Sequence, residues 1–203
     1  MKRVLWLTVL ALALPLTAFA DSVDFTNSGG ILAGCSNGLS LTGSALIAVK
    51  GLNGLGLVTG NDLGSVSFST GALMAGGSLQ MGGTFAAGGS FTITGNGTSG
   101  IPNGTIFSGT FSGPATWTLV TLANGTHNYT LTGAVAGSLN GTFYTDGVTV
   151  QLTINTGHGF FNGRTHISSG DTNVVVPEPG SLSLLGTGLL GLAGVVRRKL
   201  KVS

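Results

Sequence analysis

Charged side chains are scarce in this chain. They make up 7 % of its 203 residues, whereas a soluble domain carries roughly 25 %. This scarcity excludes a disordered acidic or basic segment, which needs a high net charge, and a coiled coil, which is rich in Glu, Lys and Arg. Proline is also scarce, with 5 residues, and the 37 glycines follow no Gly-X-Y period, which excludes collagen.

Cysteine occurs once, at Cys35, so the chain forms no internal disulfide. The segment Leu32-Ala33-Gly34-Cys35 is similar to a lipobox, the lipid-attachment signal of bacterial lipoproteins. A lipobox adjoins the apolar part of a signal peptide, but Asp21 and Asp24 precede this segment. We therefore expect Cys35 to be a small buried hydrophobic residue that carries no lipid.

Basic side chains are concentrated at the two ends of the chain. Residues 21–176 contain only Lys50 and Arg164 as basic residues, against five aspartates. A nucleic-acid partner requires a basic patch that neutralises phosphate groups. The sequence has no such patch, so we expect no nucleic-acid partner.

Residues 1–20 have the composition of a secretory signal peptide. Lys2 and Arg3 provide the positive charge, an apolar run follows, and Ala18 and Ala20 are the small residues of a cleavage site. We predict that the chain is exported and that signal peptidase cuts after Ala20.

A second apolar segment lies close to the C-terminus. Residues 182–196 carry no charge, and Arg197, Arg198 and Lys199 follow them. A helix over 180–196 would be about 25 Å long, slightly short of the hydrocarbon core of a bilayer. We predict a transmembrane helix and a basic tail over 182–203, with the basic cluster retained on the cytoplasmic side of the inner membrane.

The residues that precede this helix are distinctive. Val176-Pro177-Glu178-Pro179, then the apolar segment, then the terminal basic cluster, together resemble the PEP-CTERM sorting signal of Gram-negative bacteria. The resemblance covers about the last 27 residues. Pro177 and Pro179 also favour an extended backbone, which a protease-like site can bind.

This resemblance has implications for function. It implies recognition of Pro177, Glu178 and Pro179 by an exosortase, a membrane-embedded enzyme similar to a transpeptidase. It also implies a protein that is held in the inner membrane until it is processed and then reaches the cell surface or the medium. The family is associated with exopolysaccharide and with biofilm matrix, but the signal does not specify the passenger domain.

The passenger domain has the pattern of a β protein. Gly, Thr, Ser and Asn make up more than half of residues 21–176. Apolar residues alternate with Thr and Ser, which is the period of a half-buried strand. The clearest alternating segments are 65–69, 90–94, 116–119, 129–132 and 148–154. Asn-Gly, which favours hairpin turns, occurs seven times.

These patterns predict a mainly β fold, with an antiparallel β-sandwich or a partly closed β-barrel over 21–173. A linker over 174–181 would join it to the C-terminal helix, and a signal helix would precede it. A β-solenoid is the alternative, because Gly-Thr-Phe and its near relatives recur. Their spacing is irregular, however, and a solenoid should show a fixed period.

No arrangement of residues in the passenger domain indicates catalysis. His127, His158 and His166 match no metal-binding motif, and we expect His158 and His166 to be surface residues. The only glutamate is Glu178 in the sorting motif, so a pair of glycosidase carboxylates has no sequence signature. We therefore expect no enzymatic activity, no metal and no cofactor.

Two functional alternatives remain beside an exported structural protein of the surface or matrix. The first is a carbohydrate-binding module that uses exposed aromatic rings, with Trp117 and Tyr144 as possible ligand contacts. Phe143 and Tyr144 must point to opposite faces of a strand, and the tyrosine hydroxyl tolerates water. Trp117 could instead belong to the core. The second is a secreted hydrolase, for which the sequence offers no catalytic set.

Overall fold

A computed structural model describes residues 21–167 and 169–176, without the side chains of residues 21, 142–148, 175 and 176. The described chain consists almost entirely of strands. In chain order these are β1 (Asp21–Ser28), β2 (Ile31–Cys35), β3 (Gly38–Lys50), β4 (Val58–Ser69), β5 (Gly83–Phe85), β6 (Gly88–Asn96), β7 (Asn103–Phe111), β8 (Ala115–Thr121), β9 (His127–Leu139), β10 (Thr142–Asn155), β11 (Arg164–His166) and β12 (Ser169–Val176). A short 3₁₀ turn, η1 (Leu52–Gly54), follows β3.

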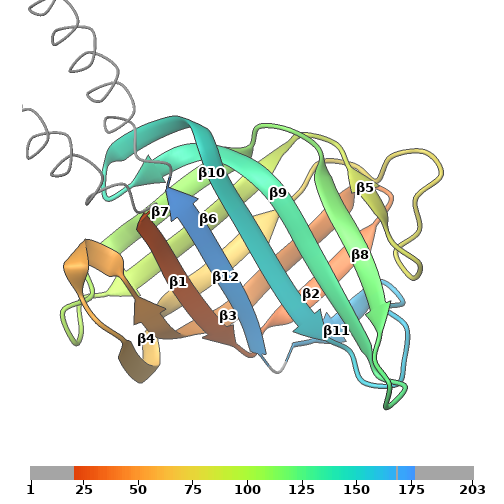
Figure 1. Cartoon of the computed structure of the whole chain (residues 1–203), viewed down its shortest axis with the longest axis horizontal. Coiled ribbons are helices and arrows are strands. Elements are labelled where there is room, and N and C mark those ends of the chain that lie inside the picture. The colour runs from red at the N-terminus through yellow and green to blue at the C-terminus, as the bar shows by residue number, and fades with distance from the viewer. Residues whose placement is uncertain (1–20, 168, 177–203) are drawn as a thin grey trace, which may run out of the picture. The chain divides into compact units, whose positions relative to one another are not determined.

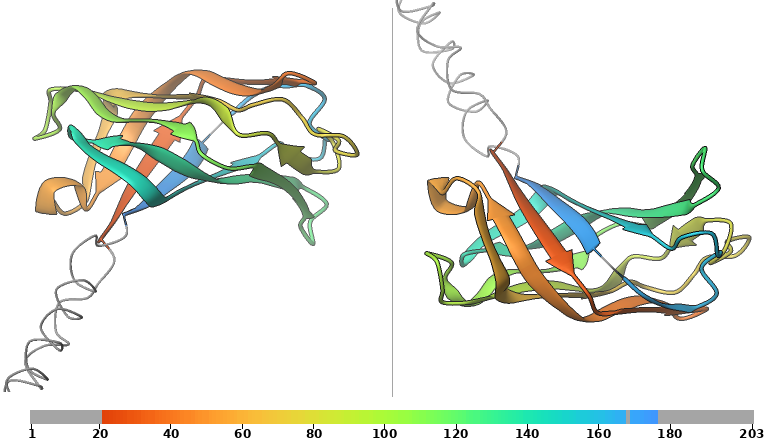
Figure 2. Two further views of the ribbon diagram at one scale, coloured as in Figure 1. Left: turned by 90° about the horizontal axis from the view of Figure 1, so that it is seen from above. Right: turned by 90° about the horizontal axis from the view of Figure 1, so that it is seen from below.

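Eight of these strands form a closed antiparallel barrel. Strands β1, β3, β4, β6, β7, β9, β10 and β12 follow one another around the barrel in chain order. Pairing of β1 with β3 on one side and with β12 on the other closes the ring (Figure 1). The views in Figure 2 show the strands wrapping around the interior. The passenger domain is therefore an up-and-down barrel.

The prediction of an antiparallel, mainly β domain is confirmed, and the barrel is closed rather than partly closed. The sandwich and the solenoid are both wrong. Alternation identifies the inward face of each strand, but it does not distinguish one curved sheet from two packed sheets. That difference depends on whether the first and last strands pair, which removes both open edges. Within residues 21–167 and 169–176, no helix has the length and apolar composition for a membrane span.

The shorter strands continue the barrel strands at one end. Ser28 pairs with Ala45, and Ile31 pairs with Thr42, so β1 and β2 follow one path along β3. In the same way β7 and β8 both pair with β9, and the interruption between them contains Pro114. Proline has no N–H to donate, so it is compatible with such a break in the ladder.

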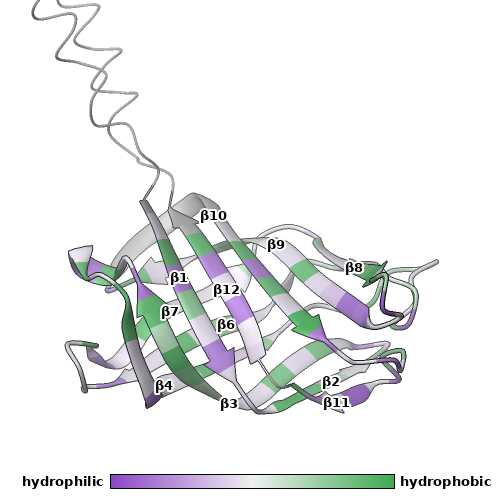
Figure 3. Cartoon of the chain, turned by 60° about the horizontal axis from the view of Figure 1, so that its bottom comes forward, coloured by the Kyte–Doolittle hydropathy of each residue, from purple (hydrophilic) through white to green (hydrophobic). Residues whose placement is uncertain are grey.

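The interior of the barrel is filled by apolar side chains, and the outer face carries hydroxyl groups. Figure 3 shows apolar and polar residues alternating along the strands. On the outer face, Ser65 and Thr94 share a hydrogen bond of 2.8 Å between their hydroxyls. The largest side chains with less than 2 % exposure are Trp117, Tyr129, Phe25, Phe85, Phe91, Phe107, Phe111 and Phe161. Burial of each large apolar side chain contributes roughly 1.5–3 kcal/mol.

The two ends of the barrel differ. Because β1 and β12 are antiparallel neighbours, β1 begins where β12 ends, and we call this side the terminal end. The loops over 51–57, 97–102 and 140–141 lie at the terminal end. The opposite side, the far end, carries the loops over 70–82, 122–126 and 156–163. Asn140 and Gly141 form a two-residue hairpin turn with φ values of 49° and 82°, as the Asn-Gly pattern predicts.

Gly64 occupies a position in β4 that accepts no side chain. It pairs with Gly95 of β6 and has a φ of +148°, and a Cβ there would lie 1.8 Å from the carbonyl oxygen of Thr94. We expect Gly64→Ala to lower the free energy of unfolding by more than about 1 kcal/mol, because the strands must separate or the backbone must change. Urea unfolding followed by circular dichroism measures this loss.

Gly113→Ala is the matched control for Gly64→Ala. Its Cβ would meet no atom within 4 Å, and Gly113 does not have a positive φ. We expect this variant to be neutral or slightly stabilising. Equal losses in the two variants would contradict the argument from close strand contact.

Candidate functional site

The sorting signal begins at the terminal end of the barrel. Strand β12 continues to Val176, and Val175 still pairs with Thr149 of β10. Residues 174–176 therefore belong to the barrel, and the predicted linker over 174–181 starts three residues too early. The β-branched run of valines favours a strand, and Pro177, which lacks an N–H, cannot donate to a further ladder bond.

Several predicted site residues lie outside the described part of the chain. These are the sorting residues Pro177, Glu178 and Pro179, the retention residues Arg197, Arg198 and Lys199, and the cleavage residues Ala18 and Ala20. The two predicted terminal helices also lie outside it. Their roles remain predictions from the sequence.

Trp117 belongs to the core rather than to a ligand site. Its side chain is 1 % exposed, and its ring stacks on Tyr129 with centroids 4.9 Å apart. Its indole N–H donates a hydrogen bond of 2.9 Å to the carbonyl of Leu79. The possible ligand contact at Trp117 is therefore wrong, because the ring has no face open to solvent. Tyr144 lies in β10, where it pairs with Gly137, but its side chain is not among those described.

Tyr129 joins two loops of the far end to the barrel. Its hydroxyl donates a hydrogen bond of 2.9 Å to the carbonyl of Gln80 and accepts one of 3.0 Å from the N–H of Phe161. Gln80 belongs to the loop over 70–82, and Phe161 belongs to the loop over 156–163. Both loops are thus held in place by the buried aromatic cluster.

The three histidines have different environments. His158 and His166 are exposed, as predicted, whereas His127 is 7 % exposed at the start of β9. The Nδ1 atom of His127 lies 3.0 Å from the hydroxyl of Thr121, at hydrogen-bond distance. Among the described residues, no group of three His, Cys, Asp or Glu side chains could hold a metal ion.

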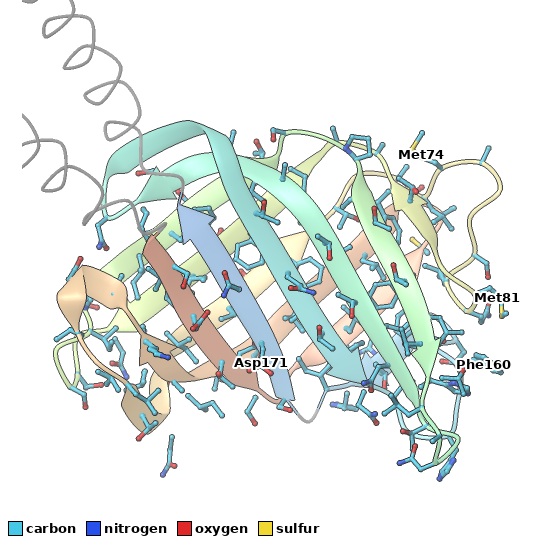
Figure 4. The ribbon with its side chains drawn as sticks, in the orientation of Figure 1. Met74, Met81, Phe160 and Asp171 are labelled. Atoms are coloured by element: carbon cyan, nitrogen blue, oxygen red, sulfur yellow. The ribbon has the colours of Figure 1, made fainter. Side chains whose placement is uncertain are left out.

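Phe160 is an exposed aromatic residue that our sequence analysis did not identify. Its side chain is 50 % exposed at the far end (Figure 4). Its ring stacks on His127 with centroids 4.2 Å apart and an interplanar angle of 18°. Strand alternation could not have indicated it, because Phe160 and Phe161 lie in the loop over 156–163.

Cys35 is exposed at the turn between β2 and β3. The expectation of a buried residue is therefore wrong. The alternation that buries Leu32 and leaves Cys35 outside depends on how strand β2 continues the barrel. Cys35, Ala33, Gly163 and Arg164 line a small depression of about 210 Å³.

A surface depression crosses β1, β12 and β10 and has a volume of about 380 Å³. Its polar lining residues are Asp24, Thr26, Gln151, Thr153, Asp171, Thr172 and Asn173. The amide of Asn173 donates a hydrogen bond to the carboxylate of Asp24. Amide, hydroxyl and carboxylate groups of this kind can form hydrogen bonds with a polar ligand, and we call this surface the polar groove.

The fold and the position of the sorting segment define an exported β-barrel whose last strand leads directly into a C-terminal signal. A model of the PEP-CTERM protein-sorting motif matches residues 175–199, so the chain carries this motif. The motif implies an exported protein that passes through the membrane and is processed there by an exosortase. No curated protein and no solved structure matches the chain.

Proposed function

We propose that this protein is a non-enzymatic structural component of the bacterial surface or extracellular matrix, and that it is associated with exopolysaccharide. The observation that carries the proposal is the sorting motif over residues 175–199, which begins within the last strand of a closed barrel. Such an arrangement suits a folded passenger that is exported and then released or retained outside the cell.

The outer surface of the barrel supports the same proposal. Hydroxyl groups form cross-strand pairs there, between Ser65 and Thr94 and between Ser69 and Ser90. The passenger contains two basic and five acidic residues, so its surface is polar but carries little charge. A surface of this type is hydrated by hydrogen bonds, and it neither attracts nor strongly repels a polyanion, which suits a polysaccharide matrix.

Carbohydrate binding by the barrel is the second candidate function. The half-exposed ring of Phe160 favours it, because an aromatic face fixed in place can stack on a sugar. The polar groove offers a second surface with hydrogen-bonding groups. This proposal does not rest on Trp117, which is buried, or on Tyr144, whose side chain is not among those described.

The intact mass of the protein from the surface and the medium of its native host tests the first proposal. We expect a chain that begins at Asp21 and ends near Glu178, because signal peptidase and exosortase each remove one end. A mass that extends to Ser203 would contradict processing by exosortase and indicate a simple membrane anchor.

A further inference from the structure

Phe160 presents one face of its ring to solvent. The other face is covered by the imidazole of His127, at a centroid distance of 4.2 Å. His127 is itself 7 % exposed, so the pair forms a step in which the phenyl ring is the outer layer. Figure 4 places this ring on the outside of the far end.

The backbone on both sides of Phe160 is held in place. The carbonyl of Gly159 accepts a hydrogen bond of 2.9 Å from the hydroxyl of Thr156. The N–H of Phe161 donates one of 3.0 Å to the hydroxyl of Tyr129, and the Phe161 ring is buried. A ring held in this way loses little conformational freedom when a ligand binds, which lowers the entropic cost of binding.

The histidine under the ring is fixed as well, since the Nδ1 atom of its imidazole lies 3.0 Å from the hydroxyl of Thr121. The backbone N–H of His127 donates a hydrogen bond of 2.7 Å to the carbonyl of Gly157, and the N–H of Thr156 donates one of 3.0 Å to the carbonyl of His127. These bonds attach the loop over 156–163 to the first residue of β9. The aromatic pair is thus part of the barrel framework.

The loops beside the ring are polar, and His158 is the one titratable side chain in the two segments. The segments 122–126 and 156–163 contain no Asp, Glu, Lys or Arg, although Arg164 follows directly. Asn124 and Asn162 are exposed and offer amide groups. A nucleotide would require several cationic groups for its phosphates, and a cationic ligand would favour a nearby carboxylate. Neither requirement is met by these two loops.

We propose that Phe160 is a stacking platform for a sugar ring of a neutral polysaccharide. The apolar face of a pyranose consists of C–H groups, which pack favourably on the electron-rich face of an aromatic ring. The hydroxyls at the rim of the sugar then form hydrogen bonds with neighbouring amides. This inference rests on the second proposed function and assigns the residue and the ligand class.

Affinity electrophoresis of the mature protein in gels that contain hydroxyethyl cellulose, dextran or alginate tests the proposal. We expect slower migration in at least one neutral polysaccharide, and Phe160→Ala should weaken that affinity about tenfold or more, by analogy with the loss of base stacking on aromatic residues. Phe160→Trp should retain the affinity because it keeps an aromatic face.

Leu57→Ala is the matched control, since Leu57 is 67 % exposed and belongs to the loop over 51–57 at the terminal end. It should leave the affinity unchanged, and a thermal melt should show that both alanine variants remain folded.

Three outcomes in the gels would overturn the proposal. These are equal affinity of Phe160→Ala and the unmodified protein, retardation by alginate alone, and no retardation in any gel. Self-association, measured by sedimentation, that depends on Phe160 without any response to saccharide would also overturn it. Intact-mass data would still decide the sorting function independently.

Discussion

Replacing Pro177, Glu178 and Pro179 together by alanine is expected to abolish C-terminal processing. The recognition element has little spare length, because β12 ends at Val176 and the apolar segment begins at residue 182. Five extended residues span at most about 18 Å. Alanine favours helix, whereas the two prolines prevent the apolar helix from continuing back towards the barrel. Without them the element can become helical and lose the extended form that an enzyme can bind.

The measurement is the intact mass of the variant in membrane and medium fractions of the native host. We expect the variant to remain in the membrane fraction with its C-terminus at Ser203. Alanine at Ser181 and Ser183 is the matched control, because it changes neighbouring residues and keeps both prolines. Glu178→Gln separates the contribution of charge from that of backbone conformation. Normal cleavage of the triple-alanine variant would show that these residues are not the recognition element.

Trp117→Ala is expected to lower the free energy of unfolding by about 3–5 kcal/mol, the usual cost of removing a large buried aromatic side chain. The substitution removes the stack on Tyr129 and the hydrogen bond to the carbonyl of Leu79. It also removes an edge contact with Phe161, whose ring centroid lies 5.9 Å away. The loop over 70–82 should lose part of its attachment, so we also expect faster hydrogen exchange in that loop.

Urea unfolding of the mature protein measures the effect. Circular dichroism is the suitable signal, because Trp117 is the only tryptophan after residue 20. Val120→Ala is the control on the same strand, since Val120 is 49 % exposed, and its effect should stay within about 0.5 kcal/mol. If Trp117→Ala unfolds at the same urea concentration as Val120→Ala, the stack on Tyr129 and the bond to Leu79 do not stabilise the barrel as expected.

Much of the strand content was predictable from local patterns. The alternating segments 65–69 and 90–94 lie in β4 and β6, and their apolar residues point inward. The period of two alone determines such a face. Not every Asn-Gly marks a turn, however. Asn103 and Gly104 begin β7, because the tight turn before them is formed by other residues, including Ser99 with a φ of 55°.

The exposure of individual aromatic and sulfur-containing residues was less predictable. Trp117 lies between two threonines and Phe160 lies between Gly159 and Phe161, yet Trp117 is buried in the aromatic cluster and Phe160 is half exposed. Cys35 is the last residue of the alternating strand β2 and is exposed. The burial of Trp117 depends on the loop over 70–82, whose Leu79 carbonyl accepts its indole N–H, and the exposure of Cys35 depends on how β2 continues the barrel. Both are long-range properties.

The sequence by itself determined the sorting motif of this protein and the strand pattern of its passenger domain. A signal peptide pattern, the Pro-Glu-Pro element and alternating strands are each readable within a few residues, because they depend on composition and on local backbone preference. Only the tertiary structure decided that the sheet closes, that the sorting motif begins within β12, and that the ring of Phe160 stacks on His127. These features join residues that are distant in the chain, such as β1 with β12, and the local sequence does not encode which distant partners meet.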